Sequence, residues 1–231
     1  MSDSHHIEGV AATIAIANLD TDQIMPKQFL RGIDKTGLDK GVLWDLRFDG
    51  EGRPRAGFVL NRPAFADARV LITGPNFGCG SSREHAVWGL QQYGIRAVIA
   101  SSFGEIFYSN AMNNRLMAVM LPQADVQALM EEAEEANDSP APLRVEIDVR
   151  ALTVRTPRRT RAFTLSERHR RMFLDGLDMI GATLTYRGDI DAFAQRHWAA
   201  QPWVRDVAGR TKHRLDEDGR RGGAASGPRS A

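Results

Sequence analysis

Short apolar runs alternate with helix-like apolar patterns through the middle of the chain. The runs are rich in β-branched and aliphatic residues and are bounded by glycine, proline or polar residues, which is typical of buried strands. The segments between them place apolar residues on one side of a helix. The pattern predicts strands at Arg69–Thr73, Arg96–Ala100 and Leu116–Met120, with helices at Ser82–Tyr93 and Phe103–Asn113 between them.

Two strand–helix–strand units in succession predict parallel strands joined by right-handed crossovers. A short strand at Thr13–Ile16 precedes them. We therefore expect an α/β fold in three layers, with a mostly parallel sheet, a small antiparallel segment and C-terminal helices. The later elements predicted are a helix at Ala124–Ala136, antiparallel strands at Arg144–Asp148, Thr153–Arg155 and Arg161–Phe163, and helices at Ser166–Leu174 and Asp189–Trp198.

The apolar pattern stops near the end of the chain. From about Gly209 to Ala231 the residues are mainly Gly, Ser, Arg and Asp without an apolar period, which predicts a disordered tail. The 231 residues, of which 42% are hydrophobic, suffice for one well-packed domain. We expect this domain to span residues 1–208 and the tail to span 209–231.

Charge and cysteine content narrow the choice of partner and compartment. A net charge of +1 gives no electrostatic reason to expect nucleic acid, and no apolar run is long enough to span a membrane. The single cysteine, Cys79, cannot form an internal disulfide or hold a metal cluster alone, so we expect a reducing, cytoplasmic compartment. A basic cluster without interleaved aromatic residues is more typical of a solvated hairpin than of a nucleic-acid site: Arg155, Arg158, Arg159 and Arg161.

The segment Gly74–His85, GPNFGCGSSREH, follows a predicted strand and leads into a predicted helix. Its glycines allow a sharp turn and a close approach of the backbone to a ligand. A helix N-terminus offers free N–H groups and partial positive charge, which suit a carboxylate or a phosphate. Arg83 adds a planar fork for a carboxylate, and Ser81 and Ser82 add hydroxyl groups.

The same residues also suit a simpler role, because a serine followed by a glutamate is a common way to begin a helix. Glycine-rich turns before helices are frequent, and this one has neither the dinucleotide-binding nor the P-loop spacing. From the residues alone, an anion-binding site and a plain helix cap both stay open.

Longer stretches of the sequence carry a family resemblance. GPNFGCGSSREHAVWGL resembles the signature of the swivelling domain of the aconitase superfamily. Three further stretches agree in the same order: NLDTDQIMPKQFLRG near the start, SSFGEIFYSNAMNN, and DGLDMIGATL at Asp175–Leu184. They cover most of the chain from about Ile14 to Trp203, and their combination resembles the small subunits of bacterial 3-isopropylmalate dehydratases, which act in leucine biosynthesis.

The resemblance implies a division of labour between two chains. In the family, a large subunit holds a 4Fe–4S cluster through three cysteines, and the cluster takes the substrate's hydroxyl group. The swivelling part closes over the site and brings a serine base for a carbon-bound proton. By motif position this base is Ser81, with Ser82 and Arg83 against a substrate carboxylate. The resemblance thus implies a required large-subunit partner and no cofactor on this chain.

Arg31 bears on the choice of substrate. It matches a substrate-binding arginine of aconitase in the stretch PKQFLRG, although a surface arginine on a flexible loop is the simpler interpretation. In related enzymes an apolar residue in this loop suits an isopropyl group, whereas an arginine suits an extra carboxylate. The resemblance implies interconversion of 2- and 3-isopropylmalate by dehydration and rehydration. Dehydratases acting on citraconate, dimethylmalate or homoaconitate are the alternative, and a carboxylate-binding module without catalysis is the second.

The residues Asp20, Thr21 and Asp22 also look like a family motif. Asp and Thr are good turn formers that hydrogen bond to their own backbone. We therefore expect these three residues to have a structural or subunit-contact role rather than a catalytic one.

Overall fold

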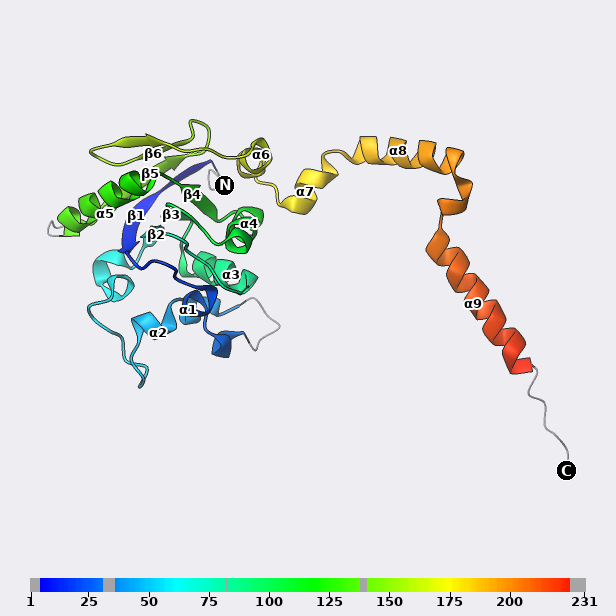
Figure 1. The fold of residues 1–231 in the computed structure, drawn as a ribbon, viewed down its shortest axis with the longest axis horizontal. Coiled ribbons are helices and arrows are strands. Elements are labelled where there is room, and N and C mark those ends of the chain that lie inside the picture. Colours follow the sequence, from blue (N-terminus) through cyan, green and yellow to red (C-terminus); the bar gives the residue numbers. More distant parts are fainter. Residues whose placement is uncertain (1–4, 31–35, 82, 138–140, 225–231) are drawn as a thin grey trace, which may run out of the picture. The chain divides into compact units, whose positions relative to one another are not determined.

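A seven-stranded sheet forms the centre of the computed structural model, which describes residues 5–30, 36–81, 83–137 and 141–224 (Figure 1). The strand order is β4-β3-β2-β1-β5-β6-β7, and β1 to β4 run parallel while β5 to β7 continue the sheet in antiparallel fashion. The strands are β1 (His6–Ile14), β2 (Ala68–Thr73), β3 (Ala97–Ala100), β4 (Met117–Met120), β5 (Arg144–Asp148), β6 (Thr153–Arg155) and β7 (Thr160–Ala162).

Helices lie on both faces of this sheet (Figure 1). The crossover from β2 to β3 contains α3 (Glu84–Tyr93), and that from β3 to β4 contains α4 (Glu105–Asn113), while α5 (Gln123–Asn137) lies on the opposite face. The long connection from β1 to β2 holds α1 (Thr21–Ile24), α2 (Trp44–Arg47) and four short 3-10 turns, and α6 (Glu167–Leu174) follows β7. The predicted three-layer α/β fold is therefore confirmed.

β1 is the strand on which the two halves of the sheet meet, since it pairs in parallel with β2 and antiparallel with β5. The prediction of a strand only at Thr13–Ile16 is wrong, because β1 begins at His6 and ends at Ile14. Its first residues are polar and partly exposed, and Glu8 forms an ion pair with Arg144 of β5 at 2.9 Å. Charged cross-strand pairs thus replace the apolar alternation by which a strand is recognised in a sequence.

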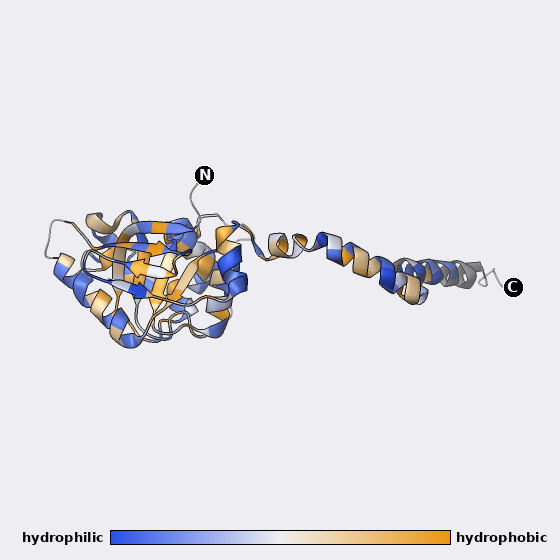
Figure 2. Cartoon of the chain, turned by 90° about the horizontal axis from the view of Figure 1, so that it is seen from above, coloured by the Kyte–Doolittle hydropathy of each residue, from blue (hydrophilic) through white to orange (hydrophobic). Residues whose placement is uncertain are grey.

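Apolar residues concentrate along the parallel strands, as the orange ribbon inside the first, sheet-containing unit shows (Figure 2). The β2 residues Val70, Leu71 and Ile72 are completely buried, as are Val98 and Ile99 of β3. Burial on both faces explains the uninterrupted apolar runs in these strands. This packed centre holds the carboxyl ends of β1, β2 and β3 in fixed positions.

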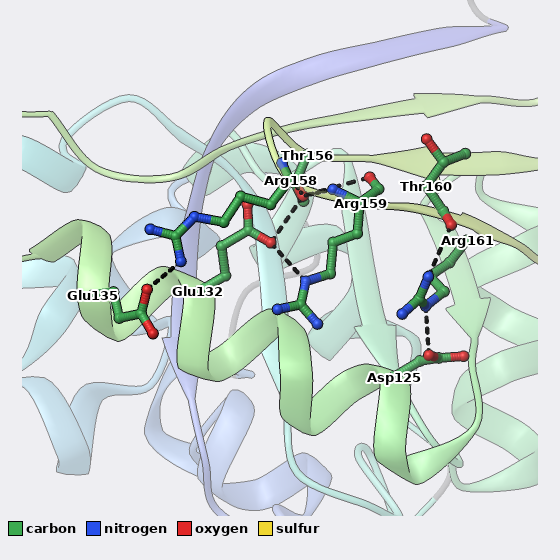
Figure 3. A network of polar contacts seen from close by, with 8 residues as sticks. All are labelled: Asp125, Glu132, Glu135, Thr156, Arg158, Arg159, Thr160 and Arg161. Carbon is green, nitrogen blue, oxygen red and sulfur yellow. Dashed lines mark hydrogen bonds and ion pairs between the residues drawn. The ribbon is translucent and has the colours of Figure 1, made fainter.

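The arginines of the β6–β7 hairpin form ion pairs with α5 rather than being only solvated (Figure 3). Arg159 Nε donates to Glu132 Oε2 at 3.0 Å, and Thr156 Oγ1 donates to the same oxygen at 2.9 Å. Glu132 is only 4% exposed, so its charge depends on these partners. Two more exposed pairs flank it: Arg158 with Glu135, and Arg161 with Asp125.

The chain divides into two compact units, Met1–Ile180 and Gly181–Ala231. The last helices are α7 (Met179–Leu184), α8 (Arg187–Ala200) and α9 (Val207–Ala224). The sequence predicts no regular structure from Gly209 onwards, whereas α9 is helical there, and its start is capped by Asp206, which accepts a hydrogen bond from Gly209 N at 3.2 Å. The division into a domain of 1–208 and a tail stays a prediction, and residues 225–231 lie outside the described part.

The two hairpin arginines with different burial provide a stability test. Arg159→Met should lower the free energy of unfolding by about 3 kcal/mol, because it leaves the buried Glu132 carboxylate without its cation. Arg158→Met should change it little, since Arg158 and Glu135 are both exposed. Urea unfolding measures the free energy of unfolding of both variants, compared at a common m-value. Equal decreases in the two variants would contradict this account.

Candidate active site

Three loops meet at the carboxyl edge of the parallel strands. The glycine-rich segment 74–83 follows β2, and it lies between the loop after β1 (residues 15–20) and the loop after β3 (residues 101–104). Because β1, β2 and β3 are parallel, their following loops emerge at the same edge. Ligand sites in such sheets lie outside the carboxyl ends of the strands.

Backbone hydrogen bonds join the central loop to both of its neighbours. On one side, Gly78 N donates to Leu19 O at 2.7 Å and Thr21 N donates to Cys79 O at 3.0 Å. On the other side, Phe77 N donates to Ser102 O at 3.2 Å and Gly104 N donates to Phe77 O at 2.9 Å. The pairing of the sheet thus continues beyond the strand ends and holds the loop rigidly.

Glycine is required where these loops approach each other most closely. A Cβ atom on Gly104 would lie 2.5 Å from the carbonyl oxygen of Gly78. Gly78 itself has a φ of +72°, and a side chain there would collide with the ring of Phe107. Both positions therefore exclude any larger residue unless the backbone moves.

Ser81 lies at the end of this loop against α1. Thr21 Oγ1 donates to the carbonyl oxygen of Ser81 at 2.8 Å and lies 3.3 Å from Ser81 Oγ. Thr21 is 1% exposed, so this anchor is buried, whereas Ser81 itself is exposed. Ser81 Oγ also donates to Asp22 Oδ1 at 3.5 Å.

Arg83 contacts the same carboxylate oxygen of Asp22 as Ser81 does. Its Nη1 lies 2.7 Å from Asp22 Oδ1, and the Arg83 side chain is only 19% exposed. The contact is an ion pair whose geometry is not that of a hydrogen bond, since the buried Nη1 has no hydrogen-bond partner among the described residues. Lys27 Nζ lies 3.7 Å from the second oxygen, Asp22 Oδ2.

The helix that follows is not capped by Ser81. α3 begins at Glu84, and Arg83 stands at the cap position without a side-chain cap. The start of α3 is instead held by Asn114, the C-cap residue of α4: its Nδ2 donates to Glu84 Oε1 at 2.6 Å, and its Oδ1 accepts a hydrogen bond from Trp88 Nε1 at 3.0 Å. The helix-cap interpretation therefore does not account for Ser81.

The structure brings two of the four predicted site residues together. Ser81 and Arg83 share Asp22 as a partner, whereas Ser82 and Arg31 lie outside the described residues. Sequence reasoning missed the contribution of Asp22, although it singled out the DTD motif. The available signal was the spacing of that motif from β1, which places it beside the loop after β2.

Aromatic rings pack around Phe77 of the glycine-rich loop. Phe77 packs edge to face against Phe107 with ring centroids 5.2 Å apart, and Phe103 continues the cluster. Phe77 is completely buried and Phe107 is 2% exposed. Tyr108 packs beside Phe103, and burial raises the pKa of its hydroxyl group. These rings belong to the hydrophobic core or pack against it, rather than forming a stacking surface for a ligand.

The donor set of this chain does not suit an iron–sulfur cluster. Such clusters are held mainly by several cysteine thiolates, and the whole sequence has one cysteine. Cys79 Sγ donates to Asn18 O at 3.3 Å, and the described residues contain no group of three His, Cys, Asp or Glu side chains that could hold a metal ion.

Comparison with known proteins agrees with this architecture. The sequence-family model of the aconitase C-terminal domain matches residues 1–124 of this chain. The 3-isopropylmalate dehydratase small subunit 1 of Chromobacterium violaceum is 62% identical over 90% of this chain and 97% of its own length. The corresponding small subunit of Phenylobacterium zucineum is 46% identical over 86% of this chain and 96% of its own.

This chain belongs to the family of 3-isopropylmalate dehydratase small subunits. The crystal structure of the family member LeuD from Methanocaldococcus jannaschii superposes with a TM-score of 0.57 at 27% identity, over 82% of this chain and 99% of that one. The resemblance noted from the sequence is confirmed, and the chain is a subunit of an aconitase-superfamily hydro-lyase.

The close approach of Gly104 to Gly78 predicts a sharp difference between two glycine substitutions. Gly104→Ala should lower the free energy of unfolding by about 2–3 kcal/mol, because the backbone on both sides resists displacement. Gly57→Ala is the matched control, since nothing lies within 4 Å of the added carbon there. Thermal unfolding measures both; a Gly104→Ala protein as stable as the control would refute the close contact.

Proposed function

We propose that the chain binds the substrate of a 3-isopropylmalate dehydratase and supplies the base for its carbon-bound proton. The enzyme interconverts 2- and 3-isopropylmalate by dehydration and rehydration. The observation that carries the proposal is the common position of Ser81 and Arg83 on a rigid loop, in a chain whose close relatives bear this enzyme's name.

Ser81 is the proposed base. As an alkoxide, its Oγ accepts the proton from the substrate carbon in one direction, and the hydroxyl so formed returns the proton in the other. A serine hydroxyl is a poor base in water, so it needs fixed positive charge and exclusion of solvent. The Arg83 guanidinium provides nearby charge, while the exposure of Ser81 in this chain calls for a second surface to close over it.

Arg83, Ser82 and Arg31 are the proposed carboxylate-binding residues. The fork of Arg83 matches a carboxylate, and Ser82 is assigned to the same carboxylate by its position in the motif. Arg31 is assigned only by its place in the sequence PKQFLRG. A change at Arg31 is expected to alter the ranking of substrates more than the rate.

A large subunit is the proposed partner, and we assign to it a 4Fe–4S cluster held by three cysteines. The single cysteine of this chain supports that assignment. Large apolar side chains exposed on the C-terminal helices, among them Ile190, Phe193 and Trp203, favour a protein partner as well. Within the described residues no helix combines the length and apolar character needed to cross a membrane. The cytoplasmic location remains a proposal that rests on the cysteine content.

The division of labour predicts the behaviour of the purified chain. Isolated under anaerobic conditions, it should be folded, contain no iron and lack the brown absorbance of a cluster. Mixed with a cluster-loaded large subunit of the family, it should convert 2-isopropylmalate, whereas either subunit alone should not. Metal analysis and an isomerisation assay test this; iron bound to the isolated chain would contradict it.

Removing the proposed base should abolish turnover. In the reconstituted complex, Ser81→Ala should lower kcat by about two to four orders of magnitude while leaving assembly intact. Ser109→Ala, an exposed serine on α4, is the matched control and should behave like the unaltered protein. Both are assayed at equal cluster content. Near-normal turnover by Ser81→Ala would move the base elsewhere, with Ser82 as the first candidate.

A further inference from the structure

Asp22 lies at the centre of the site and faces three partners. Its Oδ1 is 2.7 Å from Arg83 Nη1 and 3.5 Å from Ser81 Oγ, and its Oδ2 is 3.7 Å from Lys27 Nζ. A carboxylate therefore already stands between the proposed base and the proposed carboxylate-binding arginine. The proposed function puts a substrate carboxylate in this same position.

The pair between Asp22 and Arg83 is incomplete. The 2.7 Å contact between Nη1 and Oδ1 lacks hydrogen-bond geometry, and the second oxygen of Asp22 lies 3.7 Å from Lys27 Nζ. An arginine binds a carboxylate best through two parallel N–H···O bonds. An incoming carboxylate free to align with the fork can make both bonds, which Asp22 does not make here.

We propose that Asp22 is an internal counter-ion that occupies the place of the substrate carboxylate and leaves Arg83 when the substrate binds. The proposal rests on the proposed function, in which Arg83 receives that carboxylate. Asp22 neutralises the partly buried Arg83 while the site is empty and competes with the substrate for it. Lys27, within 4 Å, is the partner that receives the displaced Asp22 carboxylate.

The backbone allows such a movement of the side chain alone. Asp20 caps α1 by accepting a hydrogen bond from Gln23 N, and the Gln23 side chain accepts one from Asp20 N in return. Thr21 is buried and bonded to Ser81 and Cys79. The main chain at Asp22 is thus fixed, while its side chain is 40% exposed and can turn from Arg83 to Lys27.

The test measures binding of malate, a hydroxy acid with two carboxylates, to the full-length chain by NMR titration. Asp22→Asn keeps the shape of the side chain and removes the competing charge. It should bind malate about two- to fivefold more tightly than the unaltered chain, the range expected for losing a partly exposed ion pair. Asp22→Ser should show the same gain and serves as a second variant if the first folds poorly.

Two controls separate competition for Arg83 from a general change of charge. Asp45→Asn removes an equal charge from an exposed acid on α2 and should leave malate binding unchanged. In an Arg83→Gln background, Asp22→Asn should give no gain, because the group for which Asp22 competes is gone. A gain that persists in this background would overturn the proposal, since it would show only long-range electrostatics.

Weaker malate binding by Asp22→Asn would also overturn the proposal, because it would mean that Asp22 holds Arg83 in place while the ligand is bound. The result does not depend on turnover. If the reconstituted complex fails to convert isopropylmalate, the proposed function fails, while the malate titration still decides whether Asp22 competes for Arg83. If the complex is active, Asp22→Asn should lower KM for isopropylmalate by the same factor by which it lowers the dissociation constant for malate.

Discussion

The backbone pairing of the glycine-rich loop with both neighbouring loops is the constraint on which the site depends. Gly78 bonds to Leu19 on one side, and Phe77 bonds to Ser102 and Gly104 on the other. This pairing extends the parallel sheet by a few residues past its strand ends, and at Gly104 it brings the backbones too close together for a Cβ atom. The position of Ser81 therefore follows from the register of the sheet and not from the side chain of Ser81.

Electrostatics at the end of this loop are arranged around one acid. Arg83 and Lys27 converge on Asp22, so the charges that would attract a dicarboxylate are partly neutralised in the free chain. A partly buried arginine without a counter-ion would cost stability, and Asp22 offsets this cost in the free chain. Under the proposal that the substrate carboxylate displaces Asp22, stability of the free chain and affinity for the substrate make opposite demands on Asp22.

Much of the fold could be predicted from the sequence because the decisive strands are buried on both faces. β2, β3 and β4 with the helices α3 and α4 are found close to their predicted bounds. The sequence pattern predicts the start of β1 too far along the chain, because the first residues of this strand are polar and held by cross-strand ion pairs. It does not predict α9, because no apolar period marks that helix. For the site, the motif predicts Ser81 and Arg83. The contact between Asp22 and Arg83 is different, because these residues are 61 positions apart in the sequence and no local pattern indicates that they lie close together.

The central claim, that Ser81 exchanges a proton with the substrate carbon, is tested most directly by solvent deuterium. The reconstituted complex is incubated with 3-isopropylmalate in D2O, and deuterium at the substrate carbon is followed by NMR. The account predicts that the unaltered complex incorporates deuterium and that a Ser81→Ala complex with the same cluster content does not. Deuterium incorporation by the Ser81→Ala complex at a comparable rate would contradict it.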